Sequence, residues 1–300
     1  MQTRDVAELL LLSVLWGAAY LFMRAAVPAF GPGPLIALRM AIAALVLLPL
    51  LTWRGGIGQL SAHPVALLVL ALPFTALPFL MLGFAAQHLT AGLLSVLNAT
   101  APLFAALLAH FVYRERLGRW RSAGLVIGFG GVALLTAGSV SFKSTDGLLA
   151  VGAVLLTSAL WSVGANFTRK RLGGMDNLAL TVGSLALASL AVAPLAAATW
   201  PAEPPPLRAW MEMAFLGVGS SGLGFLLYYR LLRRIGTVRA MSVTFLNPVV
   251  ALVAGALYLG EVLTWQTLTG AAVVLMGTAL SLGLWPRRSR EQSQTRIEPQ

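Results

Sequence analysis

Long apolar stretches separated by short polar turns run along almost the whole chain. Charge-free runs cover residues 55–113, 122–142, 147–168 and 240–260. A membrane helix needs about 20 consecutive apolar residues, so each run is long enough to cross a bilayer. Turn residues and charges divide the chain into predicted spans at residues 6–27, 34–52, 64–86, 90–112, 119–138, 147–168, 177–199, 209–230, 238–259 and 265–285. The pattern therefore predicts an all-α, polytopic membrane protein with ten transmembrane helices.

The basic residues fall almost entirely on one side of this predicted topology. Seventeen Lys and Arg lie in loops or tails on the side of the N-terminus, whereas Lys143 and Arg208 alone lie in loops on the other side. Because short cytoplasmic loops carry an excess of Lys and Arg, we expect a multi-pass protein of the cell (inner) membrane with both termini cytoplasmic. The net charge of +11 then reflects topology, and we expect no nucleic-acid partner.

The second half of the chain repeats features of the first half. The matching residues are Ser13 and Ser158, Trp16 and Trp161, Phe22 and Phe167, and Arg24 and Arg169 at an offset of 145, then Pro102 and Pro248, and Glu115 and Glu261, at an offset of 146. Each unit holds an odd number of helices, so two copies in one chain enter the membrane from opposite sides. We predict two inverted five-helix repeats, residues 1–142 and 143–285, followed by a polar cytoplasmic tail, 286–300. A duplication that merely enlarged a helical bundle is the alternative.

Over residues 6–285 the chain resembles the ten-helix EamA-type family of the drug/metabolite transporter superfamily, in its branch of amino-acid and metabolite exporters. The likeness rests on the Ser-x-x-Trp-Gly opening from Ser13 to Gly17, on the related segment at Trp161, and on two Pro-to-Glu segments with the same spacing, 102–115 and 248–261. The resemblance implies export of amino acids, other small metabolites or toxic compounds through a central cavity. That cavity would be lined mainly by the first, third, fourth, sixth, eighth and ninth spans. Ser162 departs from the pattern, because it replaces the glycine that matches Gly17.

Aromatic and polar side chains inside the predicted spans are candidates for a substrate site. Trp16 and Trp161 hold equivalent positions, and Tyr20 follows Trp16 by one helical turn. An indole N–H in hydrocarbon needs a hydrogen-bond partner or a polar cavity, although packing against neighbouring helices explains these rings equally well. The substrate-binding candidates are Trp16, Tyr20, Arg39, Asn98, Trp161, Asn166, Thr244 and Asn247.

Two prolines strengthen the case for the amides. Pro102 and Pro248 each free a carbonyl one turn earlier, at Asn98 and Thr244. Polar backbone at membrane depth is tolerated where it lines a cavity, although hydrogen bonds between helices are the alternative explanation. Arg39 is a candidate contact for an anionic group, while a side chain that reaches toward the interface would explain it without a function.

The position of the acidic residues bears on the substrate. Glu8, Glu115, Glu212 and Glu261 all fall near span ends, so no carboxylate is predicted at the midplane. Exporters of lipophilic cations typically use a membrane-embedded carboxylate. We therefore predict a transporter that exports amino acids or similar amphipathic zwitterions by alternating access. A multidrug or lipophilic-cation exporter, a lipid translocator and a passive channel remain alternatives.

No enzymatic chemistry is predicted. The chain lacks an H-E-x-x-H motif, and the segment from Gly219 to Gly222 misses the G-x-S-x-G spacing. The absence of cysteine excludes Cys-based metal and redox sites, and we predict no metal and no cofactor. The expected partners are a small-molecule substrate and the lipid bilayer. Glycines in spans 119–138 and 265–285 predict scaffold packing or a homodimer contact, and the stretch 217–224 predicts a flexible gate or a packing face.

Overall fold

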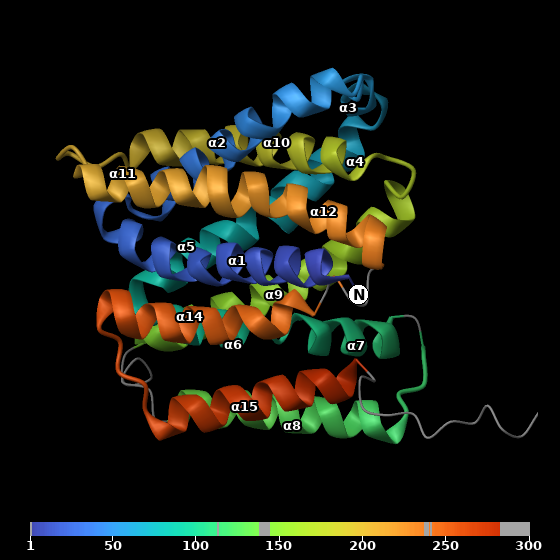
Figure 1. Cartoon of the computed structure of the whole chain (residues 1–300), viewed down its shortest axis with the longest axis vertical. Helices are drawn as coiled ribbons and strands as arrows, with labels where there is room; N and C mark the ends of the chain where they lie inside the picture. The colour runs from blue at the N-terminus through green and yellow to red at the C-terminus, as the bar shows by residue number, and fades with distance from the viewer. Residues whose placement is uncertain (1, 113, 138–144, 237–239, 241, 283–300) are drawn as a thin grey trace, which may run out of the picture.

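A computed structural model describes residues 2–112, 114–137, 145–236, 240 and 242–282. These residues form helices and turns, and no β-strand occurs among them. The long helices run side by side along one direction, across the width of the view in Figure 1. The all-α prediction is therefore confirmed.

The first half of the chain supplies five helical rods, two of which are interrupted. Its elements are α1 (Thr3–Phe30), α2 (Pro32–Trp53), the short α3 (Gly58–Ala62), α4 (Pro64–Ala71), η1 (Leu72–Ala76), α5 (Leu77–His88), α6 (Ala91–Asn98), α7 (Ala101–Phe111) and α8 (Arg119–Ala137). α4, η1 and α5 together form the third rod, and α6 and α7 form the fourth.

The second half is built from a similar series. Its elements are α9 (Thr145–Arg171), α10 (Asn177–Ala198), α11 (Leu207–Ala214), η3 (Phe215–Leu223), α12 (Gly224–Ile235), α14 (Val243–Leu259) and α15 (Trp265–Ser281). α11, η3 and α12 together form the eighth rod.

The lengths and composition of these rods fit a bilayer. Eight of them, within the described residues, are long and apolar enough to cross a membrane, and α14 is a shorter apolar helix. α15 has 17 residues and lies along α8. The prediction of a polytopic membrane protein is confirmed, and the rods agree with the predicted spans to within a few residues at their described ends.

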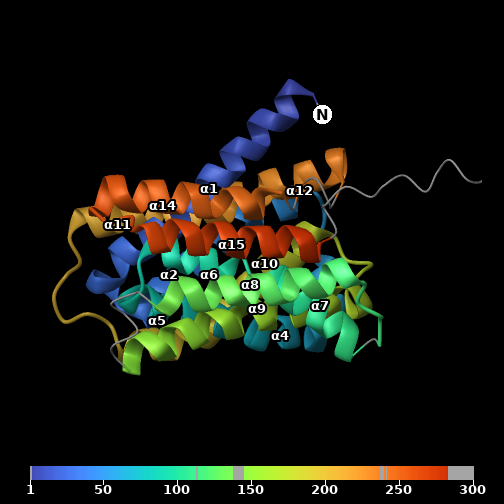
Figure 2. The same cartoon turned by 90° about the horizontal axis from the view of Figure 1, so that it is seen from below.

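Helices α8 and α15 pack closely where glycines face the neighbouring helix. Figure 1 and Figure 2 both show the two helices side by side. A Cβ atom built at Gly277 would lie 2.2 Å from the backbone nitrogen of Gly128, and one at Gly131 would lie 2.6 Å from that of Val274. Only small residues permit helices to approach this closely. The small faces predicted from the sequence therefore serve packing within the protomer.

Two middle segments depart from α-helical geometry, one in each half. η1 interrupts the third rod and η3 interrupts the eighth, and both have the wider π-helical turn. Single π-helical segments inside longer helices are frequent at functional sites. Leu72, the first residue of η1, corresponds at the 146-residue offset to Val218 inside η3.

The two Pro-to-Glu segments also end in the same local geometry. The backbone N–H of Glu115 donates to the carbonyl of Ala109 at 3.1 Å, and the N–H of Glu261 donates to the carbonyl of Gly255 at 3.1 Å. Both bonds close the last turn of a helix, α7 and α14 respectively. The second pair lies 146 residues after the first, so the sequence repeat has a counterpart in local structure.

Candidate functional site

A buried arginine lies where α2 meets η3. The Nε atom of Arg39 donates to the Oγ atom of Ser221 at 3.0 Å, and its Nη2 atom donates to the Oγ atom of Ser220 at 3.4 Å. Its guanidinium carbon lies 4.8 Å from the centre of the Phe79 ring, on the third rod. Only 6% of Arg39 is exposed, so the side chain does not reach out to the interface.

Glycines in η3 permit this contact between α2 and the serines. A Cβ atom at Gly217 would lie 2.5 Å from a side-chain carbon of Ile42, and one at Gly222 would lie 3.1 Å from a carbon of Val46. Without side chains at these positions, η3 can lie directly against α2. Of the two interpretations of the stretch 217–224, the structure therefore provides direct support for a packing face.

Tyr20 and Asn98 join this region from α1 and α6. The Nδ2 atom of Asn98 donates to the hydroxyl oxygen of Tyr20 at 2.6 Å. Tyr20 lies one helical turn after Trp16, whose indole N–H bonds to Ser220, the residue that also binds Arg39. The Oδ1 atom of Asn98 is buried and accepts no hydrogen bond from the described residues. Three of the candidates therefore form one polar cluster inside the bundle.

The two predicted tryptophans contact residues that surround Arg39. The indole N–H of Trp16 donates to the carbonyl oxygen of Ser220 at 3.1 Å, and its ring contacts Phe225 and Tyr228, at centroid distances of 5.8 and 5.2 Å. Trp161 packs edge-on against Phe79 with centroids 5.6 Å apart. Each tryptophan thus contacts a residue that also contacts Arg39.

The break between α6 and α7 exposes carbonyl groups, which hydroxyl side chains satisfy. Ser158 donates to the carbonyl of Asn98 at 3.4 Å, and Thr278 donates to that of Ala99 at 3.3 Å. The carbonyl of Asn98 is the one that Pro102 leaves without its usual partner. Hydrogen bonding between helices, one of the two interpretations of this proline, is therefore observed here.

Ser162 and Gly17 are used differently at equivalent positions. The Oγ atom of Ser162 donates to the carbonyl of Ala101 at 2.8 Å. A Cβ atom at Gly17 would lie 2.9 Å from the carbonyl oxygen of Asn247, which corresponds to Ala101 at the 146-residue offset. The departure noted in the sequence thus replaces a close contact between backbones with a hydrogen bond.

Asn166 and Asn247 do not hydrogen-bond to Arg39 or Tyr20 within the described part of the chain. Asn166 donates to the carbonyl of Ser162 on its own helix at 3.0 Å and accepts from Arg169 at 2.8 Å. Asn247 is buried on α14, and its Oδ1 atom has no hydrogen-bond partner among the described residues. Thr244 lies half-buried on the same helix.

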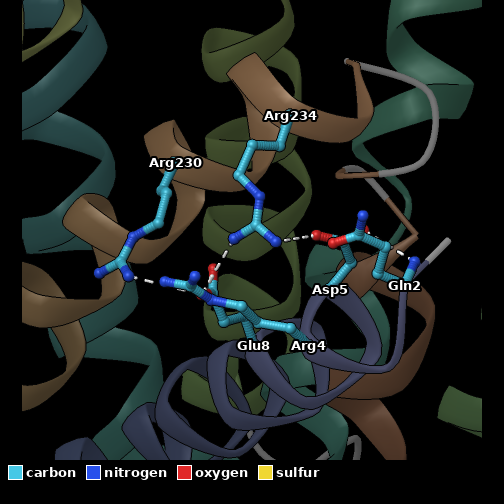
Figure 3. Close-up of polar contacts among 6 residues, drawn as sticks. All are labelled: Gln2, Arg4, Asp5, Glu8, Arg230 and Arg234. Atoms are coloured by element: carbon cyan, nitrogen blue, oxygen red, sulfur yellow. Dashed lines mark hydrogen bonds and ion pairs between the residues drawn. The ribbon is translucent and has the colours of Figure 1, made fainter.

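Ion pairs join α1 to α12 at the end of the bundle that carries the N-terminus (Figure 1). Figure 3 shows Arg234 between Asp5 and Glu8, with which it forms ion pairs. Arg230 lies 3.4 Å from Glu8, and Arg4 lies 3.1 Å from it. One oxygen of Glu8 is buried and has no hydrogen-bond partner among the described residues. The charged cluster therefore connects the first span to the eighth.

An apolar layer lies next to these ion pairs. Leu9 and Leu12 of α1 pack with Leu227 and Leu231 of α12, and all four are buried. Apolar burial and ion pairs thus act together to hold the two helices in contact at this end.

At the opposite end, carboxylates make other contacts. Both oxygens of Glu261 accept the backbone N–H of Ala91, at 2.9 and 3.1 Å, which satisfies the first turn of α6. Glu212 lies 3.1 Å from Arg208 and accepts the hydroxyl of Tyr258 at 3.3 Å. The contact of Glu261 with α6 again links the two halves of the chain.

Arg24 has a structural explanation. Its Nη1 atom donates to the carbonyl oxygens of Ala86 and Gln87, each at 2.7 Å, at the end of α5. A cation is favourable at that position because the last carbonyls of a helix lack intrahelical partners.

Within the described residues, no group of three or more His, Asp or Glu side chains lies close enough together to hold a metal ion.

Sequence reasoning missed the serines. The sequence indicates Ser220 and Ser221 only as part of the glycine-rich stretch 217–224 and of a segment without hydrolase spacing, although two adjacent hydroxyls in a span are a natural contact for a buried arginine. The contact of Phe79 with Arg39 could not be predicted, because an aromatic residue in an apolar span normally packs against neighbouring helices.

Comparison with known proteins agrees with this architecture. The EamA-like transporter family matches residues 6–137 and 148–283. The chain is 25% identical over 275 residues to an uncharacterized transporter of Archaeoglobus fulgidus, covering 87% of this chain and 92% of that protein. It is 26% identical over 296 residues to a probable terminal-alkyne amino-acid exporter of Streptantibioticus cattleyicolor, covering 97% of both.

A solved crystal structure shares the fold. It superposes with a TM-score of 0.67 at 18% identity and covers 95% of this chain and 99% of the other. The family match covers both halves of the helical bundle described above. This multi-pass membrane protein therefore belongs to the EamA-like transporter family.

Proposed function

We propose that this protein exports amino acids or similar small amphipathic zwitterions across the cell (inner) membrane. The observation that carries the proposal is the buried cluster of Arg39, Tyr20 and Asn98, which places a cation and an unsatisfied amide oxygen inside the bundle. Intramembrane polar and charged groups are costly and normally serve a substrate or ion pathway. The name of the Streptantibioticus cattleyicolor relative, a probable amino-acid exporter, supports the same substrate class.

The proposed mechanism is alternating access between two inverted repeats, 1–142 and 143–285. The contacts at the two ends support it, because different pairs of helices from the two halves meet there. At the end with the N-terminus, Arg234 holds α12 to α1, and at the other end Glu261 holds the end of α14 to α6. Release of one set while the other persists would expose the central cluster to one side at a time.

In this mechanism the central site is lined by side chains from several spans. Trp16 and Trp161 offer aromatic surface, Arg39 offers positive charge, and Asn98 offers an acceptor. Tyr20 positions the amide of Asn98. Asn247 contributes a further amide from α14, beside Thr244, as a secondary part of the lining. The chain acts as a carrier in this proposal, without chemical conversion of the substrate.

Transport by purified protein in liposomes tests the function. Proteoliposomes are supplied with each labelled amino acid in turn, with and without a pH gradient, and we expect saturable flux for at least one of them. Asn98→Ala should reduce that flux. Asn166→Ala is the matched control, because that amide bonds to its own helix and to Arg169.

The alternatives give different results in the same liposomes. Absence of saturable flux for every amino acid would contradict the proposal. Transport of a lipophilic cation or movement of a labelled lipid would then favour the drug-exporter or translocator alternative. Flux that never saturates would favour a passive channel.

A further inference from the structure

We propose that Arg39, Ser220 and Ser221 form a specific site for the carboxylate of the transported molecule. This inference rests on the proposed export function and narrows its substrate class. A carboxylate becomes a requirement for binding, and cations that lack one are excluded by the charge of Arg39.

The charge balance around Arg39 is the first argument. Its hydrogen-bond partners are the neutral hydroxyls of Ser220 and Ser221, and its guanidinium also lies against the ring of Phe79. No carboxylate of the described residues forms an ion pair with it. A buried charge without a counter-ion is costly, and a bound carboxylate would supply the missing charge.

The available donors are the second argument. The Nη1 group of Arg39 makes no hydrogen bond to the described residues, whereas Nε and Nη2 each contact a serine. Ser220 and Ser221 accept from the guanidinium, so their own hydroxyl protons remain to be donated. A planar guanidinium and adjacent hydroxyls match the donors that a carboxylate prefers. Both serines are almost fully buried, at 1% and 2% exposure.

Comparison with Arg24 separates this site from a structural arginine. Arg24 donates to the last carbonyls of α5, where its role in closing a helix end is complete. Arg39 contacts no backbone carbonyl among the described residues. Arg39 lies inside α2, so it does not bind the terminal carbonyls of a helix as Arg24 does.

Asn98 provides a binding point for the ammonium group of a zwitterion. Its Oδ1 atom is buried without a hydrogen-bond partner among the described residues, and an ammonium group would supply a donor. Tyr20 links this amide to the arginine site, because it accepts from Asn98 and lies one helical turn after Trp16, which shares Ser220 with Arg39. The cation of a bound amino acid would thus lie near Asn98, separated from the cation of Arg39.

The enclosed position of Arg39 indicates when binding occurs. At 6% exposure the guanidinium is covered in this structure, so a ligand reaches it only after the helices separate at one end. Alternating access provides that opening. Closure over the ligand then removes water from the carboxylate and the guanidinium together, which strengthens their attraction.

Matched ligands test the carboxylate directly. Purified protein in nanodiscs is mixed with L-leucine, L-leucinamide, isopentylamine and 4-methylpentanoate, and with the corresponding phenylalanine series. Ligand-dependent thermal stabilisation is recorded for each compound at increasing concentration. We expect the amino acids and the simple carboxylates to stabilise the protein, and the amides and amines to have no effect.

The results separate the inference from the proposed function. Equal stabilisation by amides or amines would overturn the carboxylate site while leaving amino-acid-like export intact. Stabilisation by simple carboxylates without amino acids would support the site and contradict amino-acid export. No response to any carboxylate in either series would overturn the inference.

Variants provide a second readout. In Arg39→Met the ligand response should weaken by roughly 10- to 100-fold, the loss expected for charge-assisted hydrogen bonds. Ser221→Ala should weaken it less, and Arg24→Gln, the matched control, should leave it unchanged. Because Arg39→Met removes a buried charge without a counter-ion, its melting temperature without ligand should not fall. A lower melting temperature with an unchanged ligand response would show a structural role and overturn the proposal.

Discussion

Trp16 on the first span donates its indole N–H to the backbone carbonyl of Ser220 on the eighth span, at 3.1 Å. The hydroxyl of the same serine accepts from Arg39 at 3.4 Å. Ser220 of η3 therefore contacts both an aromatic ring from α1 and a buried cation from α2.

Replacement of Trp16 by Phe should reduce transport while leaving membrane insertion intact. Phenylalanine retains an aromatic ring but removes the N–H that the carbonyl of Ser220 accepts. The lost hydrogen bond should lower stability by about 1 kcal/mol. Trp16→Ala, which also removes the ring contacts with Phe225 and Tyr228, should cost more. Initial rates and melting temperature measure both effects, and unchanged kinetics in both variants would remove Trp16 from the site.

Neutralisation of Glu8 should loosen the contact between α1 and α12. Glu8 pairs with Arg230 and Arg234 across that contact, so Glu8→Gln should destabilise it by about 1–3 kcal/mol. The chain contains no cysteine, so Ser13→Cys provides a single label at a buried position of α1. We expect faster maleimide labelling of that cysteine when Glu8 is neutral.

The matched control for this experiment is Arg4→Gln. Arg4 pairs with Glu8 on the same helix, and its side chain is 68% exposed. Its loss removes an ion pair of Glu8 but no link to α12. If Ser13→Cys is labelled at the same rate with and without Glu8→Gln, the ion pairs of Glu8 do not hold α1 against α12.

A methyl group at Gly277 should separate α8 from α15. The new Cβ atom would lie 2.2 Å from the backbone nitrogen of Gly128, and backbone cannot move aside cheaply. Gly277→Ala should therefore lower stability by about 3 kcal/mol or more. Gly130→Ala is the control, because no atom lies within 4 Å of a Cβ there. Equal melting temperatures for the two variants would show that this packing does not hold the bundle together.

Cysteine labelling in cells tests the orientation. Gly174 and Glu203 are exposed in loops at opposite ends of the spans. If Arg-rich loops are cytoplasmic, a membrane-impermeant maleimide should label Glu203→Cys in intact cells and Gly174→Cys only after permeabilisation. The reverse pattern would place the termini outside, and labelling of both positions in intact cells would contradict the topology.

The sequence determined the membrane architecture because span formation is a local property. A run of about 20 apolar residues satisfies its own backbone hydrogen bonds as a helix, whatever its neighbours are. The limits of α2 and α10 therefore lie within a few residues of the predicted spans 34–52 and 177–199. The glycines of α8 and α15 likewise carried a readable signal for close packing.

The substrate site stays a prediction, although the structure shows what its candidate residues contact. The sequence marks Tyr20, Asn98 and Arg39 as polar groups inside apolar spans, and the structure joins Tyr20 to Asn98 and Arg39 to a serine of η3. Asn166 met the same criterion but bonds to its own helix, because the direction of a side chain depends on how its helix is rotated. That rotation is set by packing and leaves no mark in a single sequence.

Only the tertiary structure decided which polar groups meet. Arg39 and Ser221 are separated by 182 residues, and their contact depends on the packing of α2 against η3. The same holds for Glu8 and Arg234, which are 226 residues apart. Hydropathy records the preference of each segment for the bilayer, whereas lipid gives little net preference for one helix neighbour over another. Partner choice in the membrane therefore follows from shape and hydrogen bonding across the whole bundle.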